Sequence, residues 1–224
     1  MSTKYASFIK SLRTQRGISQ SAVADKIGLS RASYIAVEQS KRELTLGEFE
    51  KLSELLGMSF RDLEYGEIPH YEKYRQMIHA FLRLNTRIPK TKLAKLLYFA
   101  DFGWYYKHLT SMSGMQYRKI QYGPVADAYF RLIDEMFDGG EISITNTENG
   151  AMLVSGTRAG AKERLSLISE NEYALMRDIN RKWKGKRTDE MVKFTHKQMP
   201  YLFAEDNDLV SYEVFGQEDP DDIY

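Results

Sequence analysis

The sequence predicts a mainly α-helical protein of the α+β class: a five-helix N-terminal domain followed by a larger helical domain with a small β-hairpin. Apolar residues recur at helical spacing along most of the 224 residues. The stretch LAKLLYFADFGWYY, residues 93–106, is apolar or aromatic on every helical face and must be wrapped by protein on several sides. Short β-patterned segments at residues 141–145 and 151–155 flank Asn149-Gly150, a hairpin turn signal.

Residues 1–66 are expected to form the N-terminal helical domain. Ser19, Ser30 and Thr45 are good N-cap residues for its second, third and fourth helices, and Gly28 ends the second. A final short turn is expected around Phe60. The inward positions of the first four helices are Tyr5, Phe8, Ile9, Leu12, Val23, Ala24, Ile27, Tyr34, Val37, Phe49, Leu52, Leu55 and Leu56.

The second and third helices and the Gly-Leu-Ser turn between them form a helix-turn-helix. The stretch ISQSAVADKIGLSRASYIAVEQSKRELTLGEFEKLSELLGMS resembles, without a gap, the DNA-binding domain of the Cro and lambda-repressor type, also called the XRE type. The resemblance implies that Gln20, Lys41 and Arg42 hold phosphates, that Arg31, Ala32, Ser33 and Ala36 read bases, and that Arg13 pairs internally with Glu38. Ser40 departs from the family, which often has glycine there.

The residue types support DNA binding without the family. Arg31 can donate two hydrogen bonds to guanine, and small Ala32 and Ser33 let the backbone approach the major groove. Residues 1–66 carry ten Lys and Arg against eight Asp and Glu, and this small excess predicts binding as a homodimer to a two-fold operator site. The alternative is a helical bundle that has lost DNA binding and whose basic side chains are merely solvated.

Gly66 and Pro69 mark a junction, which predicts domains at residues 1–67 and 68–224. In the second domain, helices are expected around residues 74–82, at the central stretch, and at residues 169–182 and 187–197. Residues 115–122 can be extended. Gly123-Pro124 is expected to lead directly into a further helix, with Pro124 at its first position and its end at Gly139-Gly140.

The second domain resembles the Panacea domain, the SocA-like antitoxin family, from about residue 71 onward. The most specific matching pieces are KLLYFAD at residues 95–101 and YGPV at residues 122–125, with Thr195-His196 as weaker support. The resemblance implies an antitoxin that binds and blocks a protein toxin of variable type, encoded in a prophage or mobile element. A repressor-like N-terminal domain fits such a pair, because it would shut down the pair's own operon.

The candidate toxin contacts are Tyr122, Gly123, Pro124, Tyr212 and Phe215. The last two lie in residues 205–224, which carry eight acids and no Lys or Arg. This segment either lies over a basic toxin surface or folds back on its own domain. A basic cluster at Arg177, Arg181, Lys182, Lys184, Lys186 and Arg187 is either a solvated face or a contact with an acidic partner or DNA.

The remaining patterns argue against other classes. The absence of cysteine excludes disulfides and thiolate zinc sites, and no histidine spacing predicts a metal site. GTRAGAK at residues 156–162 is one residue short of a phosphate-binding loop, and no catalytic motif is present, so no cofactor and no enzymatic activity are expected. No apolar run is long enough for a membrane span, and we expect a cytoplasmic protein.

The sequence therefore predicts an antitoxin of a type II toxin–antitoxin pair that also represses its own operon. The alternative is a prophage-type transcription regulator whose larger domain senses a small molecule or peptide.

Overall fold

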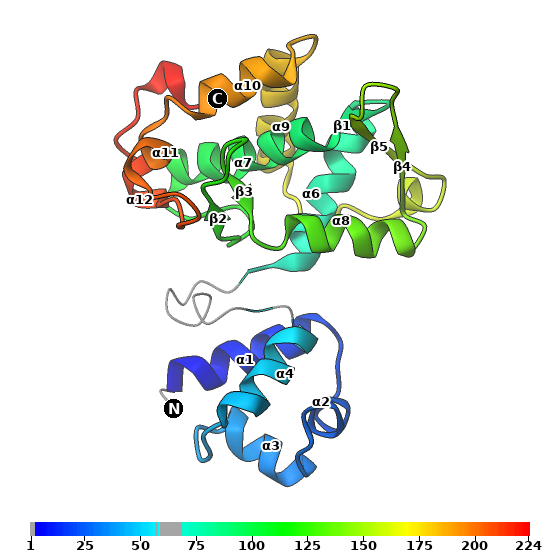
Figure 1. The fold of residues 1–224 in the computed structure, drawn as a ribbon, viewed down its shortest axis with the longest axis vertical. Coiled ribbons are helices and arrows are strands. Elements are labelled where there is room, and N and C mark those ends of the chain that lie inside the picture. The colour runs from blue at the N-terminus through cyan, green and yellow to red at the C-terminus, as the bar shows by residue number, and fades with distance from the viewer. Residues whose placement is uncertain (1–2, 57, 59–68) are drawn as a thin grey trace. The chain divides into compact units, whose positions relative to one another are not determined.

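The computed structural model describes residues 3–56, 58 and 69–224. The chain divides into two compact units, which we call the N-terminal unit, Met1–His70, and the C-terminal unit, Tyr71–Tyr224. The chain is mainly helical and carries two small antiparallel sheets (Figure 1). No helix in the described part of the chain is both long and apolar enough to span a membrane.

The N-terminal unit contains α1 (Thr3–Gln15), α2 (Gln20–Ile27), α3 (Arg31–Glu38) and α4 (Leu46–Leu56). Its helix starts are the predicted ones: Ser19 Oγ accepts from the N–H of Ala22 and Ser30 Oγ from that of Ser33, both at 3.1 Å. Gly28 ends α2 in the left-handed conformation. The short turn expected around Phe60 lies outside the described residues.

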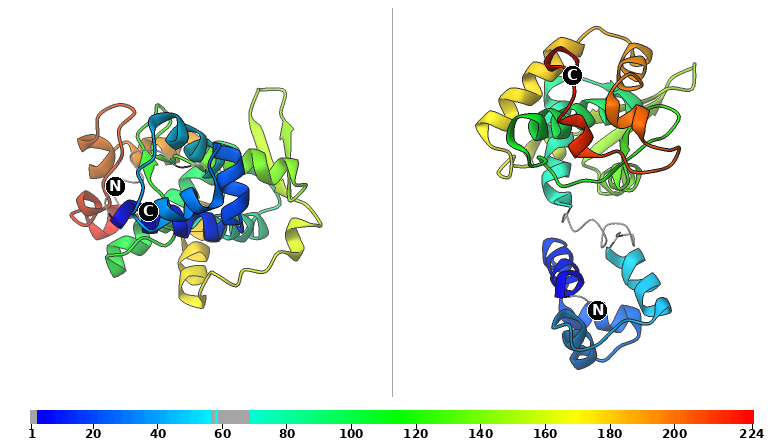
Figure 2. Two further views of the ribbon diagram at one scale, coloured as in Figure 1. Left: turned by 90° about the horizontal axis from the view of Figure 1, so that it is seen from below. Right: turned by 90° about the vertical axis from the view of Figure 1, so that its left-hand side faces the viewer.

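In the C-terminal unit, α7 (Lys90–His108) is the central helix, and every residue from Leu93 to Gly103 is buried. Around it lie α6 (Tyr71–Leu84), α8 (Tyr129–Asp138), α9 (Glu170–Trp183) and α10 (Thr188–Thr195) (Figures 1 and 2). The short helices α11 (Met199–Phe203) and α12 (Tyr212–Phe215) and the 3-10 turns η1 (Gly160–Lys162) and η2 (Pro220–Asp222) complete the unit. Phe99 of α7 stacks on Trp183 of α9 at 5.4 Å between ring centroids.

The predicted hairpin is present as β4 (Ile142–Asn146) and β5 (Met152–Gly156), which projects from the unit in both views of Figure 2. A short strand not predicted from the sequence, β1 (Ile88–Pro89), pairs with β5 and gives the sheet order β1-β5-β4.

The expected helix start at Pro124 is wrong. Residues Val125–Ala126 form β3, which pairs with β2 (Tyr117–Arg118), and α8 begins only at Tyr129. Val125, Ala126 and Ala128 are buried as the prediction required, but strand pairing with residues 117–118 holds Val125 and Ala126 extended. This short sheet positions the turn that carries Tyr122, Gly123 and Pro124.

Candidate functional sites

One face of α3 is open to solvent and carries the predicted base-reading residues. Tyr34 and Val37 are fully buried and fix the orientation of the helix. The opposite side presents small or hydrogen-bonding side chains, with Arg31 and Ala32 exposed and Ser33 and Ala36 partly exposed. A short helix whose outer face is small near its N-terminus can enter a DNA major groove closely.

A buried carboxylate connects α3 to the other helices. Glu38 accepts from Arg13 Nε at 2.5 Å and from Gln20 Nε2 at 2.9 Å, so the expected Arg13–Glu38 pair is present. Burial alone would raise the pKa of Glu38, but the hydrogen bonds from Arg13 and Gln20 hold it below its ordinary value. Gln20 Oε1 in turn accepts from Arg31 Nη2 at 3.4 Å. The network therefore reaches from the core to the proposed base-reading arginine.

The turn after α3 places two basic residues differently. Lys41 is exposed, whereas Arg42 forms a two-point ion pair with Glu48, with Nη2–Oε1 at 2.8 Å and Nη1–Oε2 at 3.2 Å. Arg42 is therefore less available to a phosphate than Lys41 is. Ser40 has φ of 59°, a left-handed conformation that explains why the family often has glycine here.

In the C-terminal unit, the three pieces that carry the Panacea resemblance meet in the core. Lys95 is fully buried, and its Nζ donates to the Pro124 carbonyl at 2.7 Å. Gly123 has φ of +85°, and a Cβ at this position would lie 2.5 Å from Thr195 Oγ1 and 3.1 Å from Lys95 Nζ. Burial lowers the pKa of Lys95 well below its ordinary value. This buried contact fixes the turn between β2 and β3.

Asp101 lies further along α7, and a tyrosine hydroxyl, a serine hydroxyl and a backbone N–H donate to its carboxylate. Its carboxylate accepts from the Ser113 N–H at 2.7 Å, Ser113 Oγ at 2.5 Å and Tyr117 Oη at 2.7 Å. Burial raises its pKa to about 6, although these hydrogen bonds act in the opposite direction. Asp101 therefore anchors β2, while Lys95 anchors the turn before β3.

His196 packs against an aromatic side chain. Its ring stacks on Tyr201 at 4.2 Å between centroids, and the Lys119 ammonium lies 4.6 Å from the Tyr201 ring. Burial, with Lys95 and Lys119 nearby, lowers the pKa of His196. Within the described residues, no group of three or more His, Asp or Glu side chains is placed to hold a metal.

The residues predicted to contact a toxin differ in their exposure to solvent. Tyr122 is 57% exposed, whereas Gly123 and Pro124 are buried. Tyr212 and Phe215 are also buried, so their placement contradicts the expectation that they touch a partner. Their aromatic rings pack on α7 instead, where Tyr212 stacks on Phe102 at 4.1 Å.

Residues 205–224 follow the second alternative and fold back on their own unit. Tyr212 Oη donates to the Met115 carbonyl at 2.8 Å, and Gln198 Nε2 donates to the carbonyls of Asp222 and Ile223. Most of the acidic side chains nevertheless remain at the surface. The predicted basic cluster of α9 and the Gly185 turn is exposed as well: Arg177, Arg181, Lys182, Lys184, Lys186 and Arg187.

Two family models match the chain, one in each compact unit. The family described as Helix-turn-helix matches residues 9–63, and the family described as Antitoxin SocA-like, Panacea domain, matches residues 93–201. No match was found among curated proteins or solved structures. The first match spans the candidate DNA-binding residues, and the second spans Lys95, Asp101, Tyr122, Gly123 and Pro124 but ends before Tyr212 and Phe215.

Proposed function

We propose that this chain, which joins an XRE-type helix-turn-helix to a SocA-like Panacea domain, is the antitoxin of a type II toxin–antitoxin pair and the repressor of its own operon. In this assignment, residues 1–67 bind operator DNA and residues 68–224 neutralise a co-encoded protein toxin by direct binding. The observation that carries the proposal is the solvent-facing side of α3, held by the buried Glu38 network, in a chain that also matches an antitoxin family.

The DNA-binding step follows from the N-terminal unit. Arg31 donates to the N7 and O6 of a guanine, which discriminates against other bases by about 1–3 kcal/mol. Lys41 lies exposed next to this helix and contributes a phosphate contact, which carries no sequence information. Arg42 joins it after releasing Glu48. The low net charge of this unit favours a homodimer on a two-fold operator.

Three alanine variants of the full chain test the DNA-binding step. Arg31→Ala is expected to relax sequence preference, whereas Lys41→Ala weakens binding to operator and unrelated DNA alike. Lys51→Ala removes an exposed lysine of α4 outside the proposed contact set and serves as the control. The measurement is affinity for promoter fragments and scrambled fragments at fixed salt. Parent-like binding by both of the first two variants would reject the assignment of α3.

Co-expression tests the antitoxin step. The neighbouring reading frame is expressed alone and together with this chain, and growth is followed. Toxicity that disappears on co-expression, with a complex recovered from the cells, is the expected result. If the neighbour alone leaves growth unaffected, the antitoxin role is rejected in favour of a prophage-type regulator with a ligand- or peptide-sensing domain.

A further inference from the structure

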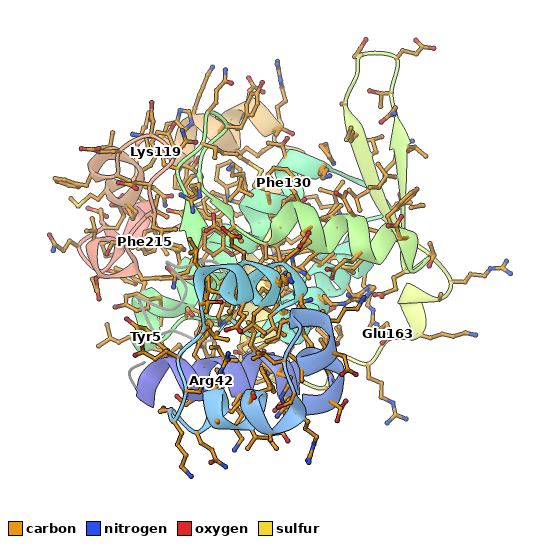
Figure 3. The ribbon with its side chains drawn as sticks, turned by 60° about the horizontal axis from the view of Figure 1, so that its bottom comes forward. Tyr5, Arg42, Lys119, Phe130, Glu163 and Phe215 are labelled. Carbon is orange, nitrogen blue, oxygen red and sulfur yellow. The ribbon has the colours of Figure 1, made fainter. Side chains whose placement is uncertain are left out.

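The C-terminal unit has a groove of about 610 Å³ between elements that are distant in the sequence. Tyr122 comes from the β2–β3 turn, Phe130 from the first turn of α8 (Figure 3) and Met152 from β5. Their exposed fractions are 57%, 49% and 47%. Single exposed apolar residues are common, but several that line one cavity of this size indicate a binding surface.

The groove is preformed, because its walls are joined by buried hydrogen bonds. Tyr129 Oη of α8 donates to the Lys90 carbonyl at the start of α7 at 2.6 Å. The Tyr122 turn is held by the bond from Lys95 to the Pro124 carbonyl. A rigid surface loses little conformational entropy when it is filled.

Basic side chains lie in the lining of the groove and next to it in the sequence. Lys90 lines it, with its ammonium 5.4 Å from the Phe130 ring, and the first residues of α7, α8 and α10 face it with the partly positive ends of their helices. Next to Thr188, which also lines the groove, the Gly185 turn exposes Lys184 and Lys186. Lys90 lies 3.6 Å from Asp134, and Arg187 pairs with Asp189 and donates its N–H to Glu190. Within the described residues, Lys184 and Lys186 form no ion pair.

The chain itself presents a segment with the complementary chemistry. Leu202 and Phe203 of α11 are 61% and 74% exposed, and exposed Glu205 and Asp206 follow them. We call residues 202–206 the α11 ridge. Apolar side chains followed by acids match an apolar groove with a basic rim.

The ridge and the groove belong to one face of the C-terminal unit. Ile120 lines the groove, and its carbonyl accepts from Tyr201 Oη at 3.4 Å, directly before the ridge. Lys119, labelled in Figure 3, donates to the Ala204 carbonyl at 3.0 Å. A projection beside a depression is the arrangement that lets two identical surfaces pair about a two-fold axis.

We propose that the α11 ridge of one copy fills the Tyr122–Phe130–Met152 groove of a second copy, and that the reciprocal contact closes a homodimer. This goes beyond the proposed function, because it assigns the surface of the dimer and does not require the toxin. Apolar side chains of the ridge enter the groove, while Glu205 and Asp206 meet the basic rim.

Matched serine variants of the full chain test the surface. Phe130→Ser and Phe203→Ser are each expected to raise the dimer dissociation constant about tenfold or more. The controls are Phe137→Ser, on the same helix as Phe130 with 48% exposure, and Leu109→Ser, with 73% exposure. Sedimentation equilibrium measures the constant, and tryptophan fluorescence confirms folding. If the controls weaken the dimer as much as the test variants, the surface is wrongly assigned.

Charge exchange tests the pairing directly. In one chain Glu205 and Asp206 are changed to lysine, and in another Lys184 and Lys186 are changed to glutamate. Each variant alone repels itself at both reciprocal contacts, whereas a mixture restores both. The expected result is monomers that form a dimer only when mixed. Failure of the mixture to associate would overturn the proposal.

A unique thiol distinguishes the occupants, because the natural chain has no cysteine. Alkylation of Met152→Cys is expected to slow as the concentration of this chain alone rises through the dimer range. Protection that appears only when the co-expressed toxin is added would reject the second copy as occupant and assign the groove to the toxin. A dimer that leaves Met152→Cys unprotected would reject this surface but leave the dimeric repressor intact.

Discussion

Gly123→Ala is expected to destabilise the C-terminal unit by about 2–5 kcal/mol, from two separate causes. At φ of +85°, an L-residue costs about 1–2 kcal/mol more than glycine. The added Cβ also lies 2.5 Å from Thr195 Oγ1 and 3.1 Å from Lys95 Nζ. Both side chains are fully buried, so neither can move into solvent, and overpacking adds about 1–3 kcal/mol.

Gly140→Ala separates these two causes. Gly140 has φ of +70°, but a Cβ there would meet no atom within 4 Å, so only the backbone cost of about 1–2 kcal/mol is expected. Urea unfolding of the full chain, followed by tryptophan fluorescence, is the assay. Both tryptophans, Trp104 and Trp183, lie in the C-terminal unit, so the signal reports on that unit alone.

Thr195→Ala supplies the decisive comparison, because it removes the oxygen that the new Cβ would meet. In that background, the cost of Gly123→Ala should fall towards the cost of Gly140→Ala, which is a coupling of neighbouring sites. Equal costs for Gly123→Ala and Gly140→Ala in the parent, or a cost of Gly123→Ala unchanged by Thr195→Ala, would refute the close approach of the three segments.

Three further predictions concern Ser40, Asp101 and Lys95. Ser40→Gly is expected to stabilise the N-terminal unit by up to about 1 kcal/mol, because glycine adopts the left-handed φ of 59° without strain. Hydrogen exchange of the α3 amides measures this stability, and lower protection of those amides in the variant would contradict the prediction. Burial raises the pKa of Asp101 to about 6 from 3.8, so between these values the folded state binds more protons than the unfolded state. The free energy of unfolding of the parent minus that of Asp101→Asn should therefore fall by at most about 3 kcal/mol as pH rises through this window. If that difference stays constant with pH, the pKa of Asp101 is not shifted. Lys95→Met keeps the packing of the aliphatic part of the lysine side chain, so in the urea assay it should destabilise the C-terminal unit by about 2 kcal/mol less than Lys95→Ala does. Equal losses of unfolding free energy in the two variants would show that this aliphatic part does not pack.

The features that the sequence predicted correctly depend on local chemistry. N-caps at Ser19 and Ser30 depend on a hydroxyl and the next turn of backbone, and the hairpin on one Asn-Gly turn. These interactions need few distant residues, which is why spacing alone reveals them.

The errors arise where distant segments decide the structure. Val125 continues the apolar stripe of α8, so a helix from Pro124 was a reasonable expectation, but pairing with Arg118 makes it a strand. Strand β1 has only two residues, and no periodicity can reveal it. Tyr212 and Phe215 have the composition of a contact segment, yet the apolar surface of α7 buries them. Composition describes a segment without saying what covers it.

In the candidate sites too, features set by local spacing could be predicted from the sequence, whereas features set by distant segments could not. The outward face of α3 follows from helical periodicity, because burying Tyr34 and Val37 places Arg31 on the other side. The ion pair that holds Arg42 joins the turn after α3 to the first turn of α4, and helical periodicity does not indicate it. In the C-terminal unit, Tyr122 was predicted to contact a toxin, which stays a prediction. Phe130 and Met152 were not singled out, because only the fold brings them to the groove that Tyr122 lines.

Two buried ionisable residues of α7, Lys95 and Asp101, hold the β2–β3 segment from its buried side and leave its other side exposed. Asp101 binds the segment that enters β2, and Lys95 binds the turn that leads into β3, so one helix holds the β2–β3 strip at two points. That strip carries Ile120 and Tyr122, which border the groove and the ridge. Substitutions on the exposed side of the strip alter the contact surface without disturbing its anchors.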